Sequence, residues 1–407
     1  MRSILSKFDK KLKGVVNLTS SKSESNRALL INALSGNKLT LENLSAARDT
    51  QTMMRLFKEK GPIWDVLDAG TTMRFCTAYL GVNGKGETIT GTPRMKERPI
   101  GLLGDALTKL GAHVEYLEKP GYPPLRISGI KEQLTQKIQI PGNVSSQYIS
   151  ALLMIGPVLP KGLELELTTE VFSRPYIEMT LALMDHFGVK SEWKGNTIGI
   201  KPQTYKQTTY RIESDWSGAS YWFSFATLNP ASDLTLTGLK EDSLQGDQEI
   251  TDITSKMGLV SEYVSDGVRL HNKNTSEHSI RVDFKTCPDL AQTVMVIAAI
   301  KGIELHMTGL ESLRIKETDR IAAMTAELRK IGARLEEKDQ TWTLFPGEIP
   351  EKIAPIETYE DHRMAMAFAP VCQIREIEIL DPEVVNKSYP AFWDDLKSVG
   401  VVIKEAH

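Results

Sequence analysis

The chain has 407 residues, of which 41% are hydrophobic and 25% are charged, so a globular protein of about two domains is expected. Its net charge of −3 provides no overall basic surface for nucleic acids or acidic membranes, and no apolar run approaches the roughly 18 residues of a membrane span. Three scattered cysteines indicate neither a disulfide framework nor a zinc site, and the charged N-terminus differs from a signal peptide. We therefore expect a cytoplasmic protein that binds neither nucleic acid nor membrane.

A pattern of strand, polar turn, helix and strand recurs along the whole chain. In the first copy, a strand at 15–18 is followed by a helix over 26–34 and a strand at 39–41. The six copies are expected, in chain order, at residues 15–41, from about 69, and then at 138–167, 210–236, 279–305 and from about 361. Copies of this kind predict a repeated fold rather than a single large sheet.

Each copy continues into a second amphipathic helix. Five of these helices are expected to end beside a glycine suited to a C-terminal cap, namely Gly111, Gly188, Gly258, Gly332 and Gly400. The sequence thus predicts an α/β fold of six strand-helix-strand-helix-strand units, which divide naturally as three and three. If three units surround a pseudo-threefold axis, the N-termini of their first helices converge, and two such domains face to face form a cleft suited to anions.

Basic residues stand beside the turns that open these helices. Lys22 and Arg27 are five residues apart at the first helix, so both side chains can reach one anion. Arginine binds phosphate and carboxylate groups through two parallel hydrogen bonds. Because six basic clusters share one structural position, we expect a substrate with more than one negative group.

Two acidic residues in or near these clusters are candidates for proton transfer. Glu317 adjoins Lys316, and Asp289 opens the fifth repeat's helix after Pro288. The local pattern by itself favours a helix N-cap for Asp289. No Walker loop, dinucleotide fingerprint or metal-ligand spacing occurs, so neither a cofactor nor a metal is expected.

Six motifs together resemble those of the enolpyruvyl transferase family, in the right order and over essentially the whole chain. They are Ser21-Lys22-Ser23 with Asn26-Arg27, the stretch from Ala69 to Arg74, the stretch from Pro93 to Pro99, Val144-Ser145-Ser146-Gln147, the stretch from Lys316 to Arg320, and the stretch from Asp361 to Met366. The resemblance implies two inverse α/β domains of three units each, with the active site in the interdomain cleft. It also implies that the chain crosses between domains near residues 20 and 214, which gives domains of 21–213 and of 1–20 with 214–407.

Within the family, the motifs are most similar to those of the branch that acts on shikimate 3-phosphate. The resemblance implies transfer of the enolpyruvyl group of phosphoenolpyruvate to the 5-hydroxyl of shikimate 3-phosphate, in the shikimate pathway, by a monomer. It assigns proton transfer to Asp289 and Glu317, assisted by Lys22. It assigns shikimate 3-phosphate to Lys22, Ser23, Arg27, Ser145, Ser146, Gln147, Ser173, Tyr176, Asp289 and Lys316, and phosphoenolpyruvate to Lys22, Gly70, Arg98, Gln147, Arg320, Arg363 and Lys387.

The sequence departs from the family pattern at three positions. The family usually has Asn where Asp68 and Ser312 stand, and many relatives have Pro where Phe75 stands. A carboxylate at Asp68, beside a phosphate-binding turn, repels the phosphate unless Arg74 or another cation offsets its charge.

Two other functions are compatible with parts of the sequence. A sister enzyme transfers enolpyruvyl to a UDP-amino sugar and uses a Cys in a mobile loop, but the corresponding stretch from Gly91 to Lys96 contains no Cys. A non-catalytic protein that binds anions or RNA would be expected to have a basic face and exposed aromatic residues. The charge of −3 and the aromatic content of 7% argue against that alternative.

Overall fold

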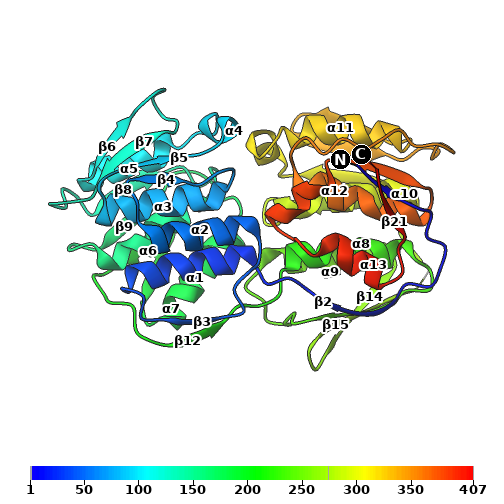
Figure 1. Ribbon diagram of the computed structural model, residues 1–407, viewed down its shortest axis with the longest axis horizontal. Coiled ribbons are helices and arrows are strands. Elements are labelled where there is room, and N and C mark those ends of the chain that lie inside the picture. The colour runs from blue at the N-terminus through cyan, green and yellow to red at the C-terminus, as the bar shows by residue number, and fades with distance from the viewer. Residues whose placement is uncertain (1, 274, 407) are drawn as a thin grey trace. The chain divides into compact units, whose positions relative to one another are not determined.

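The computed structural model describes residues 2–273 and 275–406, and the chain forms two compact units (Figure 1). One unit runs from Ser20 to Ile212, and the other combines the segment before Ser20 with the segment after Ile212. The chain therefore passes from one unit to the other twice. Within the described residues, no helix is both long and apolar enough to cross a membrane.

The unit from Ser20 to Ile212 contains two four-stranded sheets that share one topology. The first and second strands are parallel, and the fourth strand lies antiparallel between the second and the third. The strands are β4 (Ile63–Asp65), β5 (Lys85–Thr90), β6 (His113–Tyr116) and β7 (Leu125–Ser128) in one sheet, and β8 (Lys137–Ile140), β9 (Leu163–Leu167), β10 (Ser191–Lys194) and β11 (Thr197–Ile200) in the other. Each of these two sheets thus has four strands, whereas the sequence predicted three strands for each repeat. The additional strand arises because the third and fourth strands form a hairpin.

The other unit repeats this topology in two sheets, and its third sheet is modified. The four-stranded sheets contain β2 (Lys13–Asn17), β13 (Asp233–Thr237), β14 (Leu259–Val264) and β15 (Gly267–Asn272), and β16 (Ser279–Asp283), β17 (Glu304–Thr308), β18 (Arg334–Lys338) and β19 (Thr341–Phe345). The third sheet has the order β20 (Ile377–Leu380), β1 (Arg2–Leu5) and β21 (Ile403–Ala406). Both chain ends therefore lie side by side in one sheet (Figure 1).

Two strands at the crossings are exchanged relative to the repeats expected from the sequence. The expected first copy joined the strand at 15–18 to the strand at 39–41. Instead, β2 pairs in parallel with β13, and β12 (Thr209–Arg211) pairs in parallel with β3 (Thr40–Glu42). Each crossing segment thus completes a sheet whose other strands are distant in sequence.

The first helix of every repeat lies in the interior of its unit. These helices are α1 (Lys22–Leu34), α3 (Gly70–Asn83) and α6 (Ser146–Ile155) in one unit, and α8 (Trp216–Leu228), α10 (Ala291–Lys301) and α12 (His362–Phe368) in the other. In the second unit the three helices all contact one another. In α8 every residue except Ser217 is buried, as expected for a helix that is apolar on all sides. The inner helices therefore form much of the core of each unit.

The remaining helices cover the sheets or connect them, and the predicted glycine caps are confirmed. Gly111, Gly188, Gly258, Gly332 and Gly400 all have positive φ angles beside the ends of second helices. At Gly258 a side chain is also excluded by space, since a Cβ would lie 1.7 Å from the carbonyl oxygen of Thr275. The covering and connecting helices are α2 (Arg48–Glu59), α4 (Pro93–Lys96), α5 (Gly101–Leu110), α7 (Arg174–His186), α9 (Ile250–Lys256), α11 (Arg320–Lys330) and α13 (Phe392–Ser398), with short 3-10 segments η1 (Gly156–Val158) and η5 (Ala369–Gln373).

Candidate active site

Asp289 lies at the centre of an ionic cluster in the unit that contains both chain ends. It belongs to the 3-10 turn η3 (Pro288–Leu290), which leads directly into α10. The side chain does not cap that helix, so the N-cap favoured by the local pattern is wrong. Its Oδ1 accepts a hydrogen bond from Nη1 of Arg320 at 3.1 Å, and its Oδ2 accepts one from Nη2 of Arg363 at 2.9 Å. Nζ of Lys316 lies 3.9 Å from the same carboxylate.

The cations around Asp289 decide its charge. Burial by itself disfavours the ionised carboxylate, but Arg363, Lys316 and Arg320 outweigh that effect and hold the pKa of Asp289 well below its usual range. Burial lowers the pKa of Lys316, and Asp289 partly offsets this. Asp289 is therefore an anion at any neutral pH, and it orients the arginines that surround it.

Arg320 joins three carboxylates although its side chain is only 2% exposed. Its Nε donates to Oδ2 of Asp361 at 2.7 Å, and its Nη2 donates to Oε2 of Glu317 at 3.0 Å, in addition to the bond to Asp289. Burial disfavours the guanidinium charge, but the three carboxylates outweigh it and raise the pKa of Arg320 above its ordinary value. Arg320 thus fixes the positions of the two acids predicted to transfer protons.

Glu317 lies between two cations. Its Oε2 accepts from Arg320, and its Oε1 lies 3.6 Å from Nζ of Lys387, in the 3-10 segment η6 (Pro382–Lys387). The Glu317 side chain is 14% exposed, so it remains accessible to a small molecule. Its neighbour Ser312, one of the departures from the family pattern, lies half-buried in η4 (Glu311–Ile315).

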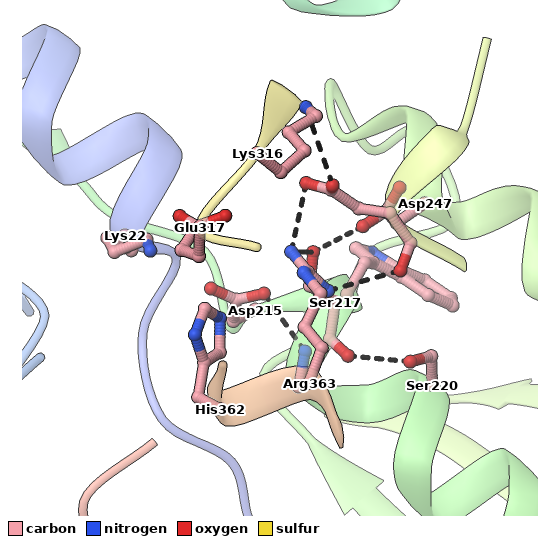
Figure 2. Close-up of polar contacts among 12 residues, drawn as sticks. Lys22, Asp215, Ser217, Ser220, Asp247, Lys316, Glu317, His362 and Arg363 are labelled. Carbon is pink, nitrogen blue, oxygen red and sulfur yellow. Dashed lines mark hydrogen bonds and ion pairs between the residues drawn. The ribbon is translucent and has the colours of Figure 1, made fainter. Parts of the chain in front are cut away.

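Arg363 connects the N-terminal ends of the three inner helices in this unit. It is the second residue of α12, and besides Asp289 it contacts the hydroxyl oxygen of Tyr221 at 3.3 Å and that of Ser217, in α8, at 3.5 Å. Asp361 caps α12 through the backbone nitrogen of Arg363 at 2.9 Å. Figure 2 shows Arg363 beside Ser217 and Asp247. Within this unit, the predicted convergence of helix N-termini is therefore confirmed.

The unit from Ser20 to Ile212 carries the remaining predicted residues. Lys22 opens α1, and its Nζ lies 3.2 Å from Oδ2 of Asp49, a buried residue of α2. Ser21 caps α1, so Lys22 and Ser23 stand at the helix N-terminus, where partial positive charge favours anions.

The guanidinium of Arg27 forms several hydrogen bonds within the protein, which the sequence did not indicate. Its guanidinium donates to Oγ1 of Thr180 at 2.7 Å, to Oγ of Ser150 at 3.2 Å, and to the carbonyl oxygens of Ser23 at 3.0 Å and Tyr176 at 3.2 Å. It also lies over the Tyr176 ring, with its central carbon 5.7 Å from the ring centroid. Burial lowers the pKa of Arg27 to about 10, so it remains charged at neutral pH. Arg27 therefore ties α1 to α6 and α7.

The N-terminal ends of α3 and α6 meet through one hydrogen bond. Nε2 of Gln147 donates to Oγ1 of Thr71 at 3.1 Å. Gly70 opens α3 against the buried guanidinium of Arg98, since a Cβ at residue 70 would lie 2.8 Å from Nη1 of Arg98. This close approach brings the two residues predicted to hold one anion together.

The predicted serines of this unit occupy helix starts. Ser145 is exposed and caps α6 through the backbone nitrogen of Gln147 at 3.4 Å, and Ser146 begins the helix and is buried. Ser173 precedes α7 with a φ of 53°, a left-handed conformation that is uncommon for a residue with a side chain. Tyr176 lies in the first turn of the same helix. No group of three or more potential metal ligands occurs in residues 2–273 and 275–406.

These features agree with the comparisons with known proteins. Residues 7–65 and 59–396 match the family described as EPSP synthase (3-phosphoshikimate 1-carboxyvinyltransferase). The chain belongs to this family. It is 48% identical over 408 residues to a 3-phosphoshikimate 1-carboxyvinyltransferase of Bacteroides fragilis, with 99% of both chains covered, and 37% identical to that of Pasteurella multocida, with 94% of both covered. It shares the fold of an EPSP synthase structure from Acinetobacter baumannii at a TM-score of 0.79 and 20% identity, over 100% of both chains.

Several residues that hold the motif side chains in place have no signal, or only a weak one, in the sequence. Asp49 holds Lys22, Asp361 holds Arg320, and Asp247 contacts Ser217. Asp361 belongs to a motif of the family, so its negative charge beside Arg363 was a usable signal. Asp49 and Asp247 lie outside the motifs and far in sequence from their partners, and no local pattern marks them.

Proposed function

We propose that this enzyme transfers the enolpyruvyl group of phosphoenolpyruvate to the 5-hydroxyl of shikimate 3-phosphate and releases phosphate. The ionic cluster of Asp289, Glu317 and Arg320 carries the proposal, because it joins two carboxylates to cations at the N-termini of inner helices. Full-length identity of 48% to a 3-phosphoshikimate 1-carboxyvinyltransferase supports the same reaction. The reaction belongs to the shikimate pathway to aromatic amino acids. The cytoplasmic location and the monomeric state expected from the sequence remain predictions.

We propose that residues of both units act on the same two substrates. Shikimate 3-phosphate is assigned to Lys22, Ser23, Arg27, Ser145, Ser146, Gln147, Ser173, Tyr176, Asp289 and Lys316. Phosphoenolpyruvate is assigned to Lys22, Gly70, Arg98, Gln147, Arg320, Arg363 and Lys387. Helix N-termini and arginines support this assignment, since both favour phosphate and carboxylate groups.

The proposed chemistry is an addition followed by an elimination. In the addition, Glu317 delivers a proton to C3 of phosphoenolpyruvate, the 5-hydroxyl oxygen bonds to C2, and Asp289 takes the hydroxyl proton. In the elimination, Glu317 takes a proton back from C3, the bond between C2 and the phosphate oxygen breaks, and the proton held by Asp289 is passed to the leaving phosphate with the help of Lys22. The surrounding cations stabilise the charge that develops.

The low pKa of Asp289 has a consequence for its role as a base. A carboxylate that is surrounded by Arg363, Lys316 and Arg320 is ionised but weakly basic. An anionic substrate at Arg363 competes for that cation and so raises the pKa of Asp289. The carboxylate thus becomes a better proton acceptor when phosphoenolpyruvate is bound.

The decisive experiment is phosphate release from phosphoenolpyruvate by the purified enzyme, with shikimate 3-phosphate, with a UDP-amino sugar, and with neither. Release that requires shikimate 3-phosphate supports the proposal. Release with the UDP-amino sugar would favour the sister activity, and folded protein inactive with both acceptors would contradict enolpyruvyl transfer.

A further inference from the structure

Asp247 is a buried carboxylate next to the ionic cluster, and none of the proposed steps uses it. It lies in the 3-10 segment η2 (Gly246–Glu249), and only 2% of the residue is exposed. Its Oδ2 accepts a hydrogen bond from Oγ of Ser217. Its Oδ1 is buried and has no hydrogen-bond partner among the residues that the structure describes. A buried carboxylate with one unsatisfied oxygen is costly when it is ionised, and far less so when it holds a proton.

Ser217 links Asp247 to the proposed substrate site. Its Oγ donates a hydrogen bond to Asp247 and accepts one from Nη2 of Arg363 at 3.5 Å. The same Nη2 donates to Oδ2 of Asp289 at 2.9 Å. Figure 2 shows this chain from Asp247 through Ser217 to Arg363. Ser217 is also the one residue of α8 that is not fully buried, and it lies at the N-terminal end of that helix.

The groups that face Asp247 come from several elements. Asp289 of η3 and Asp215, the N-cap of α8, are negative, and Arg363 of α12 is positive. Cys287 before η3 also interacts with Asp247, and Glu249 belongs to the same segment as Asp247. Burial, reinforced by Asp289 and opposed by Arg363, raises the pKa of Asp247 to about 7. Asp247 therefore changes its charge within the physiological pH range.

We propose that Asp247 is a positioning residue whose protonation, relayed through the hydroxyl of Ser217, strengthens the binding of phosphoenolpyruvate at Arg363. This inference rests on the proposed function. When Asp247 is ionised, it draws the Ser217 proton toward itself, and Ser217 can only accept at the substrate side. When Asp247 is protonated, its own proton is donated to Oγ of Ser217. The Ser217 hydroxyl is then free to turn and donate to the anion beside Arg363.

The test is the pH profile of KM for phosphoenolpyruvate, at saturating shikimate 3-phosphate, in the wild type and two variants. In the wild type, KM is expected to rise about 3- to 10-fold between about pH 6 and 8.5. A tenfold rise corresponds to a pKa of Asp247 that is about one unit higher with phosphoenolpyruvate bound than without it. Asp247→Asn mimics the protonated acid and should give a low KM whose only pH dependence is that of the substrate's own titration. Ser217→Ala removes the relay and should give a high KM with the same residual pH dependence. Titration of the substrate affects all three proteins alike, so ratios to the wild type isolate Asp247.

The outcomes separate this inference from the proposed function. A wild type without phosphate release in the presence of shikimate 3-phosphate contradicts the function itself. If the wild type is active and the KM profiles of Asp247→Asn and Ser217→Ala are as steep as its own, only the relay is overturned. The relay is also overturned if the variants lose kcat by the same factor at every pH and do not show the expected changes in KM. Asp395→Asn is the matched control, since Asp395 is a carboxylate whose pKa is also raised by burial but which contacts Tyr389 rather than Ser217. If Asp247→Asn does not fold, Ser217→Ala alone decides, because a KM profile as steep as that of the wild type in this variant refutes the relay.

Discussion

Nη2 of Arg48 lies 2.7 Å from Oδ2 of Asp68, directly before the turn that opens α3. Asp68 stands where the family usually has Asn, and its charge was expected to repel a phosphate at Gly70 unless a cation offset it. Arg48 is such a cation, whereas Nη1 of Arg74 donates to the carbonyl oxygen of Gly70. The departure at residue 68 is therefore accompanied by a compensating arginine from a different helix.

Removal of Arg48 should weaken phosphoenolpyruvate binding. Arg48→Ala leaves Asp68 uncompensated, and KM for phosphoenolpyruvate is expected to rise about two- to fivefold, since exposed ion pairs contribute roughly 0.2–1 kcal/mol. Steady-state kinetics at low ionic strength measures the effect. The double variant Arg48→Ala with Asp68→Asn should restore the wild-type KM. Equal KM values in the single and double variants would show that the charge of Asp68 does not reach the substrate.

Substitution of Glu317 should affect turnover more than binding. Glu317→Gln keeps the shape of the side chain but cannot exchange a proton with C3, so kcat should fall by at least about 10²-fold while KM values change little. Stopped phosphate-release assays measure kcat. Glu337→Gln, which alters an exposed carboxylate paired with Arg314, is the matched control. Near-normal turnover of Glu317→Gln would rule out its assigned role.

Arg320 should contribute to stability as well as to substrate binding. Arg320→Met leaves Asp361 buried without its guanidinium partner and removes the common partner of Asp289 and Glu317. Because breaking a buried ion pair on one side costs about 3–5 kcal/mol, the free energy of unfolding should fall by that amount. Urea denaturation followed by fluorescence measures it. Arg314→Met, at a partly exposed ion pair, should change stability by less than about 1 kcal/mol. An Arg320→Met protein as stable as the wild type would exclude a structural contribution of this cluster.

Arg27 should likewise have two effects. The resemblance assigns Arg27 to shikimate 3-phosphate, and the hydrogen bonds of Arg27 to Thr180 and Ser150 are buried, so Arg27→Ala should both weaken substrate binding and destabilise the fold. Each hydrogen bond to a buried charge contributes roughly 1.5–3 kcal/mol, so the free energy of unfolding should fall by about 3 kcal/mol or more. Calorimetric titration with shikimate 3-phosphate and urea denaturation measure the two effects separately. Weakened binding with unchanged stability would mean that the buried contacts of Arg27 are not formed in solution.

Stability should depend on pH in opposite senses through Asp247 and Asp289. The raised pKa of Asp247 means that the folded state holds its proton more tightly, so the contribution is present below about pH 4 and is lost as the pH rises through about 7. The pKa of Asp289 is lowered, so its contribution is present above about pH 4 and is lost only as the solution becomes strongly acidic. Asp247→Asn should therefore gain stability relative to the wild type at pH 8 compared with pH 5. A difference that does not vary with pH would place the Asp247 pKa at its ordinary value.

Much of the architecture was predictable because its signals are local. The inner helices α1, α6, α8 and α12 each begin at a polar residue whose side chain caps the helix, and each glycine after a second helix has the positive φ that an L side chain disfavours. The basic clusters of the motifs lie at these same turns. Helix starts and ends depend on a few neighbouring residues, so a sequence pattern can identify them without knowledge of the rest of the fold.

Tertiary structure alone decided which distant segments meet. The pairing of β2 with β13, and of β12 with β3, could not be read from strand patterns, because pairing depends on the path of the whole chain. The change of Asp289 from an expected helix cap to an ion-pair centre has the same cause. A cap is stabilised by the backbone next to it, whereas Arg320 and Arg363 reach Asp289 only after α10, α11 and α12 have packed. The sequence by itself thus determined the elements and the chemistry of their ends, and packing determined which charges neutralise one another.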